Sequence, residues 1–339
     1  MSEAGIVRNA GAARRIIPTA RANAPAPRGL QRRRRAFQAG FFVLFVLAPV
    51  FDLFRYDLHA DHAWLLGMEW RLGLDDFLAG RIGAGEAAAN LGLRLFLPLL
   101  GGAALFLWAA WKWGRLYCGW LCPHFSVVET INRLLARATG KPSVWEKKPL
   151  PPWKPDGTPA RVDARWWFGV VPAAVGFAFL WAVVLLTYLL PPAEVYGNLF
   201  AGELSRNQAL FIGAATVVLS LEFLFARHLF CRYVCAVGLF QSLAWMSNRD
   251  AMVVGFARQR GRDCTDCLPD RQAACDAVCP MRLTPRNIKR HMFTCTQCAQ
   301  CIDACAQTQH DNPQGPLLRW VSDAAARQNE AGFSAIRRQ

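Results

Sequence analysis

The chain has 339 residues, of which 53% are hydrophobic and 12% aromatic, and its formal net charge is +15. Only 19% of the residues are charged and 12 are cysteines. This composition excludes a disordered chain and a soluble secreted protein, and it disfavours a nucleic-acid binder. The cysteines are grouped in CxxC and CxxxC patterns, which favours metal ligation over a disulfide framework.

Four apolar stretches predict a membrane protein. A helix needs about 20 residues to cross the hydrocarbon core, and the stretches reach that length when their flanking residues are included. The alternative of buried helices in a large soluble core fits these lengths less well. The predicted spans are about 36–55, 92–112, 166–190 and 207–227.

The charges of the loops predict the orientation. Residues 1–35 carry nine Arg and one Glu, and residues 113–165 carry nine basic and four acidic side chains. The segment 55–90 has six acidic and three basic residues instead. Because basic loops stay on the cytoplasmic side, both ends of the chain are expected in the cytoplasm of a bacterium, with the helices in its inner membrane. The run Arg32–Arg35 before the first span faintly resembles a twin-arginine signal, but a retained anchor is the preferred interpretation.

An internal repeat follows the second and fourth spans. LYCGWLCP contains Cys118 and Cys122, and LFCRYVCA contains Cys231 and Cys235. Two spans per repeat would place both pairs on one face of the membrane, where four thiolates could meet. A third iron–sulfur cluster, a copper site and a thiol/disulfide pair all remain open, and the alternative without a ligand is four small buried residues.

The first CxxxC pair leads into a predicted amphipathic helix. Phe125, Val128, Ile131 and Leu135 form its apolar stripe, and Glu129 lies off that stripe. A second, shorter helix of this kind is expected to end at Met246. Both are expected to lie along the membrane interface.

The strongest pattern lies between residues 264 and 305. Cys295-x2-Cys298-x2-Cys301-x3-Cys305 has the spacing of a bacterial ferredoxin run, and Cys264-x2-Cys267-x7-Cys275-x3-Cys279-Pro280 repeats it with the insertion LPDRQAA at 268–274. In such runs the fourth cysteine binds the other cluster. Two 4Fe–4S clusters are therefore predicted, and zinc is the less favoured alternative. Their predicted ligand sets are Cys264, Cys267, Cys275 and Cys305 for the first cluster, and Cys295, Cys298, Cys301 and Cys279 for the second.

These motifs resemble those of the membrane polyferredoxins of the NapH, NosR and CcoG (RdxA, FixG) type. The resemblance runs from about residue 37 to about residue 320 and rests on GRLYCGWLCP, the second CxxxC, the eight tail cysteines and the closing segment DNPQGPLLRW. The second motif departs from the family pattern because Ala236 stands where Pro is usual. The resemblance implies electron transfer between the membrane and a redox partner, by quinol oxidation in NapH-like proteins or by copper reduction for a haem–copper oxidase in CcoG-like ones.

The predicted function is membrane-bound electron transfer between the quinone pool and a redox partner protein. Glu222, near the cytoplasmic end of the fourth span, is the candidate acceptor of a quinol proton, since carboxylates within membrane spans tend to be functional. Pairing with Arg227 is the alternative. A copper-reducing assembly factor for an oxidase and a non-redox scaffold with structural clusters are the other candidate functions. No nucleotide-binding fingerprint is present, so neither a nucleotide nor a nucleic acid is an expected partner.

The predicted fold class is an α-helical integral membrane protein with four spans in two helix–helix–CxxxC repeats, followed by a small cytoplasmic α+β ferredoxin-like domain. The predicted units are a basic disordered tail (1–35), a membrane domain (36–250), a two-cluster ferredoxin domain (251–320) and a C-terminal tail (321–339).

Overall fold

The computed structural model describes residues 29–264, 267–268 and 273–336. Most of the expected disordered tail and four of the seven inserted residues therefore lie outside the described residues. The last seven residues of that tail, 29–35, instead form the first turns of a helix. Burial of Arg34 against a later helix explains this difference.

The described chain is mostly helical. Its longer helices are α1 (Gly29–Leu47), α3 (Ala84–Leu91), α4 (Leu97–Trp113), α6 (Pro123–Thr139), α7 (Trp167–Thr187), α8 (Pro192–Ala201), α9 (Arg206–Leu221), α10 (Ala236–Ser247), α12 (Gln300–Thr308) and α13 (Asp323–Ile336). The short ones are α2 (Leu74–Leu78), α5 (Leu116–Trp120), α11 (Ala274–Ala277) and the 3-10 turns Ala164–Trp166, Arg258–Asp263 and Lys289–Met292. Wider π-helical turns occupy Gly92–Phe96, Glu222–Ala226 and Phe230–Val234.

Two small sheets complete the secondary structure. Strands β1 (Phe54–Asp57), β2 (His62–Leu65) and β3 (Met68–Trp70) form an antiparallel meander. Strands β4 (Val253–Phe256) and β5 (Leu318–Val321) pair antiparallel, with Val254 opposite Trp320.

Three helical stretches of the described chain are long and apolar enough to cross a membrane, namely Ala84–Trp113, Ala164–Thr187 and Arg206–Ala226. The predicted first span, 36–55, does not have its expected bounds, because α1 ends at Leu47 and a turn leads into β1. Pro49 in that turn lacks the amide needed to continue the helix, and Asp52 adopts a left-handed backbone. A membrane protein with three candidate spans is what the structure supports.

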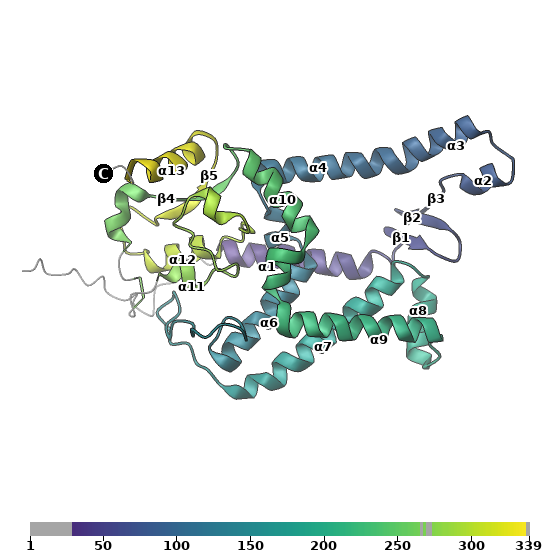
Figure 1. Ribbon diagram of the computed structural model, residues 1–339. Coiled ribbons are helices and arrows are strands. Elements are labelled where there is room, and N and C mark those ends of the chain that lie inside the picture. The colour runs from purple at the N-terminus through teal and green to yellow at the C-terminus, as the bar shows by residue number, and fades with distance from the viewer. Residues whose placement is uncertain (1–28, 265–266, 269–272, 337–339) are drawn as a thin grey trace, which may run out of the picture.

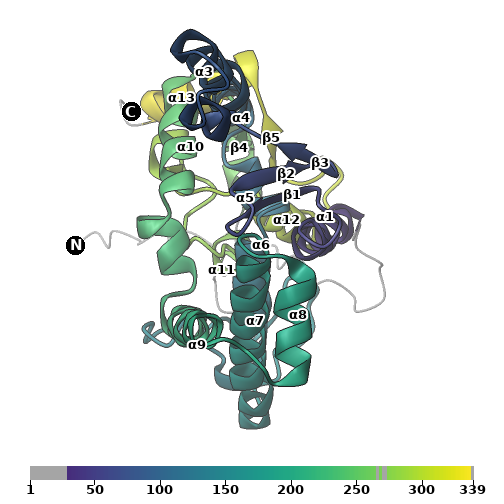
Figure 2. The same ribbon diagram turned by 90° about the vertical axis from the view of Figure 1, so that its right-hand side faces the viewer.

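Helices α1, α4 and α9 have nearly parallel axes and α7 is inclined to them, with the β1–β3 sheet at one end of the bundle and the C-terminal lobe (residues 251–336) at the other (Figure 1). The view from the sheet end shows α4 standing apart from α7 and α9 (Figure 2). Ala174, Ala178 and Ala182 on α7 are fully buried, and such small residues let helices approach closely in a membrane. By contrast, α4 exposes several leucines, which suits contact with lipid.

The amphipathic helix α6 buries its predicted stripe. Phe125, Val128, Ile131 and Leu135 are all almost completely buried. Glu129 was expected off that stripe, yet it is also buried, because it accepts a charge-assisted hydrogen bond from Arg34 of α1. Helix α6 thus packs between α1 and α7 instead of exposing its whole polar face.

The C-terminal lobe is attached to the helical bundle by polar contacts. Lys289 is buried and donates hydrogen bonds to the carbonyl oxygens of Trp245 (2.7 Å) and Asn248 on and next to α10. Asn248 in turn donates to the carbonyl oxygen of Trp111 on α4 (3.1 Å). These contacts hold the lobe against the ends of α4 and α10, which are the helices beside the two CxxxC motifs.

Candidate metal centres

A first cavity lies in the core of the C-terminal lobe. Its walls include all four predicted ligands of one cluster, namely Cys279, Cys295, Cys298 and Cys301. The cavity has an empty volume of about 350 Å³, and the remaining wall is largely apolar, with Met281, Leu283 and Met292 among its residues. We call it the inner cavity because it faces the helical bundle.

The loop around the inner cavity has an uncommon backbone. Gln297 and Ala299, which flank Cys298, both have positive φ values (52° and 57°). Non-glycine residues rarely adopt this conformation, and here it lets the chain curl so that its three closely spaced cysteines face one cavity. The amide of Leu283 donates to the Cys279 sulfur (3.4 Å), as expected of a protein that tunes a sulfur-bound metal.

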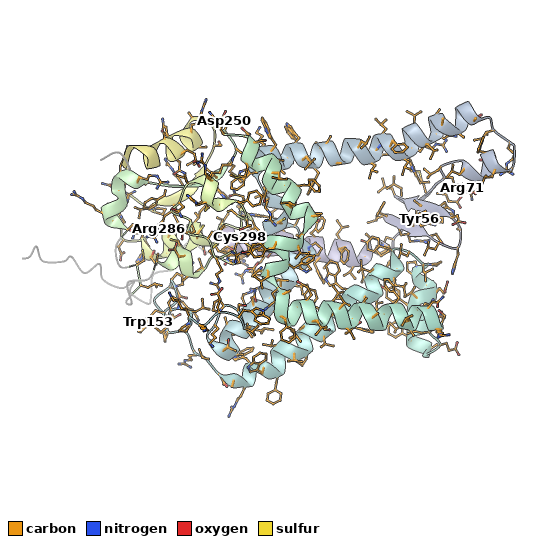
Figure 3. The ribbon with its side chains drawn as sticks, viewed as in Figure 1. Tyr56, Arg71, Trp153, Asp250, Arg286 and Cys298 are labelled. Carbon is orange, nitrogen blue, oxygen red and sulfur yellow. The ribbon has the colours of Figure 1, made fainter. Side chains whose placement is uncertain are left out.

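A second cavity, the outer cavity, contains the other predicted set. Cys264, Cys267, Cys275 and Cys305 line an empty volume of about 260 Å³ together with Phe256, Leu317 and Leu318. The Leu317 amide lies 3.4 Å from the Cys305 sulfur, and Arg286 reaches towards Cys264 (4.0 Å) while pairing with Asp276. Figure 3 shows Arg286 on the side of the lobe away from the helical bundle.

The donor sets fit iron–sulfur cubes. Each set has four thiols spread around an apolar cavity, whereas among the described residues no three metal-binding side chains converge closely enough for a single ion. That spread suits a four-iron cube better than one tetrahedral zinc. Burial raises the pKa of Cys275 to about 12 and that of Cys279 to about 11. Cys275 and Cys279 are therefore protonated at neutral pH, and binding of a metal by their sulfurs must release those protons.

The four CxxxC cysteines form a third group between the bundle and the lobe. Cys118 and Cys231 are buried, and Cys122 packs in one hydrophobic cluster with Cys231. Burial and the neighbouring Cys118 and Cys235 raise the pKa of Cys122 to about 12. Thiols of the two repeats thus lie close together, and their role as ligands of one metal centre stays a prediction.

Arg115 joins the two CxxxC motifs. Its guanidinium is almost completely buried and donates a hydrogen bond to the Cys231 carbonyl oxygen (2.9 Å). Its Nε has no partner among the described residues. A buried cation with spare donors fits beside a group that carries negative charge, such as four metal-bound thiolates. Sequence reasoning missed this residue, although it stands three positions before Cys118.

The three groups of cysteines are contiguous. Cys122 and Cys231 of the CxxxC group pack in one cluster with Cys279 of the inner cavity. Cys301 of the inner cavity packs in another cluster with Cys275 and Cys305 of the outer cavity. A single path of packed side chains therefore leads from the helical bundle to the far side of the lobe. Figure 3 shows Cys298 where the lobe meets the bundle.

Glu222 lies close to the CxxxC group. Its Oε2 is 3.0 Å from Nε2 of His124, and Nδ1 of the same ring is 3.7 Å from the Cys231 sulfur. Among the described residues Glu222 forms its ion pair with His124 and none with Arg227. Its second oxygen is buried without a partner there. His124 follows Cys122-Pro123 directly, and this position beside a CxxxC cysteine is the pattern that could have indicated it.

The chain is similar to known iron–sulfur and electron-transport proteins. The family model described as "4Fe-4S binding domain" matches residues 95–142 and 207–250, which are the segments that contain the two CxxxC motifs. The putative electron transport protein YccM of Escherichia coli is 25% identical over 56% of this chain and 48% of its own length. The methylamine utilization ferredoxin-type protein MauN of Methylorubrum extorquens is 25% identical over 80% of this chain and 84% of its own length.

The regulatory protein NosR of Pseudomonas aeruginosa is 26% identical over 76% of this chain but only 30% of its own length. The chain thus spans about half of YccM and less than a third of NosR. No solved structure matches it.

Proposed function

We propose that the chain, which is similar to 4Fe–4S binding and electron-transport proteins, transfers electrons from membrane quinol to a cytoplasmic redox partner. When bound, 4Fe–4S clusters supply one-electron oxidation and reduction. The observation that carries the proposal is the contiguity of the three cysteine groups, from the CxxxC motifs through the inner cavity to the outer cavity.

In this proposal eight cysteines hold two clusters in the lobe. Cys295, Cys298, Cys301 and Cys279 hold one at the inner cavity, and Cys264, Cys267, Cys275 and Cys305 hold the other at the outer cavity, as their lining supports. Cys118, Cys122, Cys231 and Cys235 hold a third metal centre, for which an iron–sulfur cluster is favoured over copper. The match of the 4Fe–4S family model to these two segments and the spare donors of Arg115 support that preference.

Arg115 and Glu222, which lie beside the CxxxC group, are proposed to have different roles. Arg115 offsets negative charge at the CxxxC group, and Glu222 accepts a proton when quinol is oxidised at the membrane end of the path. The place of Glu222 at the end of the candidate span Arg206–Ala226, with one buried oxygen unpartnered among the described residues, supports that role. The protein is proposed to sit in a bacterial inner membrane, with α1 as a fourth span and both chain ends in the cytoplasm.

The first test is iron and acid-labile sulfide per chain in anaerobically purified protein. About twelve irons are expected, corresponding to three four-iron clusters. About eight irons per chain would contradict a third cluster, and the CxxxC thiols would then be free for copper or disulfide chemistry. Little iron with bound zinc would overturn electron transfer altogether.

A second measurement tests the donor. Mixing the oxidised protein anaerobically with a reduced quinone analogue is expected to bleach the visible absorbance of the clusters. If dithionite bleaches that absorbance but quinol does not, the quinol step is overturned while electron transfer through the chain stands.

A further inference from the structure

A large open groove lies beside the inner cavity and shares Cys279 and Pro280 with its wall. Its lining comes from the ends of α1 and α6, from the connecting segment 141–163, and from residues 277–280 and α12 across the gap. The empty space is about 3250 Å³, and Cys279, a predicted cluster ligand, forms part of its wall. Figure 3 shows Trp153, which also lines it, near the lower edge of the lobe. We call this feature the arginine groove.

The groove is strongly basic. Seven basic and three acidic side chains line it. The best placed acid, Glu129, already accepts hydrogen bonds from Arg34, Gln38 and Gln300. The negative charge of Glu129 is therefore compensated mainly by Arg34, and it neutralises the other arginines of the groove only weakly.

Three of those cations form no ion pair within the part of the chain that the structure describes. Arg35, Arg133 and Arg137 have no carboxylate oxygen of a described residue within 4.0 Å. Burial lowers the pKa of Arg133, and the like charges of its neighbours Arg35, Arg34 and Arg137 lower it further against the effect of Glu129. Arg35, Arg133 and Arg137 are exposed side chains, and cations that repel one another along an open groove create a site that favours a polyvalent anion.

The groove also offers contacts for the uncharged part of a ligand. The guanidinium of Arg137 lies 4.8 Å from the ring centroid of Trp166, at the start of a candidate membrane span. Oδ1 of Asn132 is buried in the groove lining without a partner among the described residues. It can accept a hydrogen bond from a hydroxyl group, such as that of a glycerol or a ribose.

The chain's own N-terminal segment is a poor occupant. Residues 1–28 contain five Arg and one Glu, so their charge has the same sign as the groove. An anion from outside the chain is the complementary occupant.

We propose that the arginine groove binds a phosphate-bearing ligand through Arg35, Arg133 and Arg137. The shared chemistry is a phosphate group with a hydroxylated neighbour, which an acidic phospholipid of the inner leaflet or a soluble nucleotide both supply. A ligand there adds negative charge next to Cys279, and negative charge near a cluster lowers its reduction potential. The occupancy of the groove would thus regulate the inner centre.

Binding is tested on the full-length protein with its iron bound. One arm places it in lipid nanodiscs of phosphatidylcholine alone or with phosphatidylglycerol, and follows the midpoint potential of the inner centre by redox titration. The other arm titrates the protein in neutral detergent with inorganic pyrophosphate and ADP, and follows binding by calorimetry. An effect of phosphatidylglycerol alone identifies a lipid, whereas binding of pyrophosphate or ADP identifies a soluble ligand.

Variants of the groove arginines test whether the groove causes the binding and the shift in midpoint potential. Arg133→Gln with Arg137→Gln is expected to weaken binding at least about tenfold, since each charge-assisted hydrogen bond contributes appreciably, and to abolish the shift in potential. Arg137→Lys, which keeps the charge, should retain most of the binding. Arg165→Gln is the matched control, because Arg165 is basic and near the same helix end but does not line the groove.

Three results would overturn the proposal: no binding of either probe class, an equal loss with Arg165→Gln, or undiminished binding by the double variant. The iron content of each variant, measured in the same samples, shows that it is folded. These readouts do not depend on quinol oxidation, so the proposed function and the groove can fail separately.

Discussion

Gly119 lies directly against the loop that contains Cys298. A Cβ at Gly119 would be 3.2 Å from the backbone nitrogen and Cα of Cys298, and only 2.2 Å from the carbonyl oxygen of Thr296. The adjacent Trp120 donates to the carbonyl oxygen of Gln297 (3.1 Å). The first CxxxC motif and the inner cavity are therefore joined backbone to backbone, and only glycine allows that approach.

Gly119→Ala is expected to separate these two loops. The added methyl group must displace backbone, and such overpacking costs about 1–3 kcal/mol. We expect slower electron transfer between the CxxxC centre and the inner centre, and a weaker magnetic interaction between them by EPR. Gly102→Ala on α4 is the control, since its Cβ meets nothing within 4 Å. Unchanged transfer rates in Gly119→Ala would show that the contact carries no electrons.

The buried pair of Arg34 and Glu129 should contribute strongly to stability. Their side chains are 1% and 9% exposed, and breaking a buried pair costs about 3–5 kcal/mol because the remaining charge is uncompensated. We expect Arg34→Gln to lower the thermal unfolding temperature clearly. The exposed pair Arg71–Glu69, with exposures of 64% and 45%, serves as the comparison. Arg71→Gln should have an effect near zero, and an equal effect of both variants would contradict this reasoning.

The crossed ligand assignment predicts which cysteines behave alike. Cys305→Ser is expected to change the EPR signal of the same cluster as Cys275→Ser, although Cys305 belongs to the second run in sequence. Cys279→Ser should likewise resemble Cys295→Ser. The reason is the shared lining of the outer and inner cavities. If Cys305→Ser instead altered the signal that Cys295→Ser alters, each run would hold its own cluster.

Gly238 leaves the space that Arg115 occupies. A Cβ there would lie 2.2 Å from Nη2 of Arg115, so Gly238→Ala should displace the guanidinium from the Cys231 carbonyl. We expect the iron content to fall from about twelve to about eight per chain, because only the CxxxC centre loses its support. The control is Gly213→Ala on α9, where a Cβ meets nothing. Full iron content in Gly238→Ala would exclude a supporting role for Arg115.

Glu222→Gln tests the proton acceptor. The amide keeps the shape and a hydrogen bond to His124 but cannot take up a proton, so quinol-driven bleaching should slow at least about tenfold, in line with the usual effect of losing a general base. Bleaching by dithionite should be unchanged. Glu203→Gln, an exposed acid on the loop between α8 and α9, is the control. An undiminished quinol rate would remove Glu222 from the mechanism.

Much of this organisation follows from the sequence alone. The ferredoxin spacing of the eight tail cysteines predicts both ligand sets, because three closely spaced thiols can reach one cube and the fourth reaches the other; that they bind clusters stays a prediction. The structure lines one cavity with each set. The stripe from Phe125 to Leu135 likewise predicted the buried face of α6, since helical periodicity is a local property.

Other features depended on contacts between distant segments. The end of α1 at Leu47, the burial of Glu129 and the pairing of Glu222 with His124 could not be read from local patterns. Nor could the approach of Gly119 to Cys298, which are far apart in the chain. Sequence determined which side chains can ligate iron and which segments are apolar enough to enter a membrane. Tertiary packing decided how the three cysteine groups meet, because only long-range contacts fix the distance between loops on separate elements.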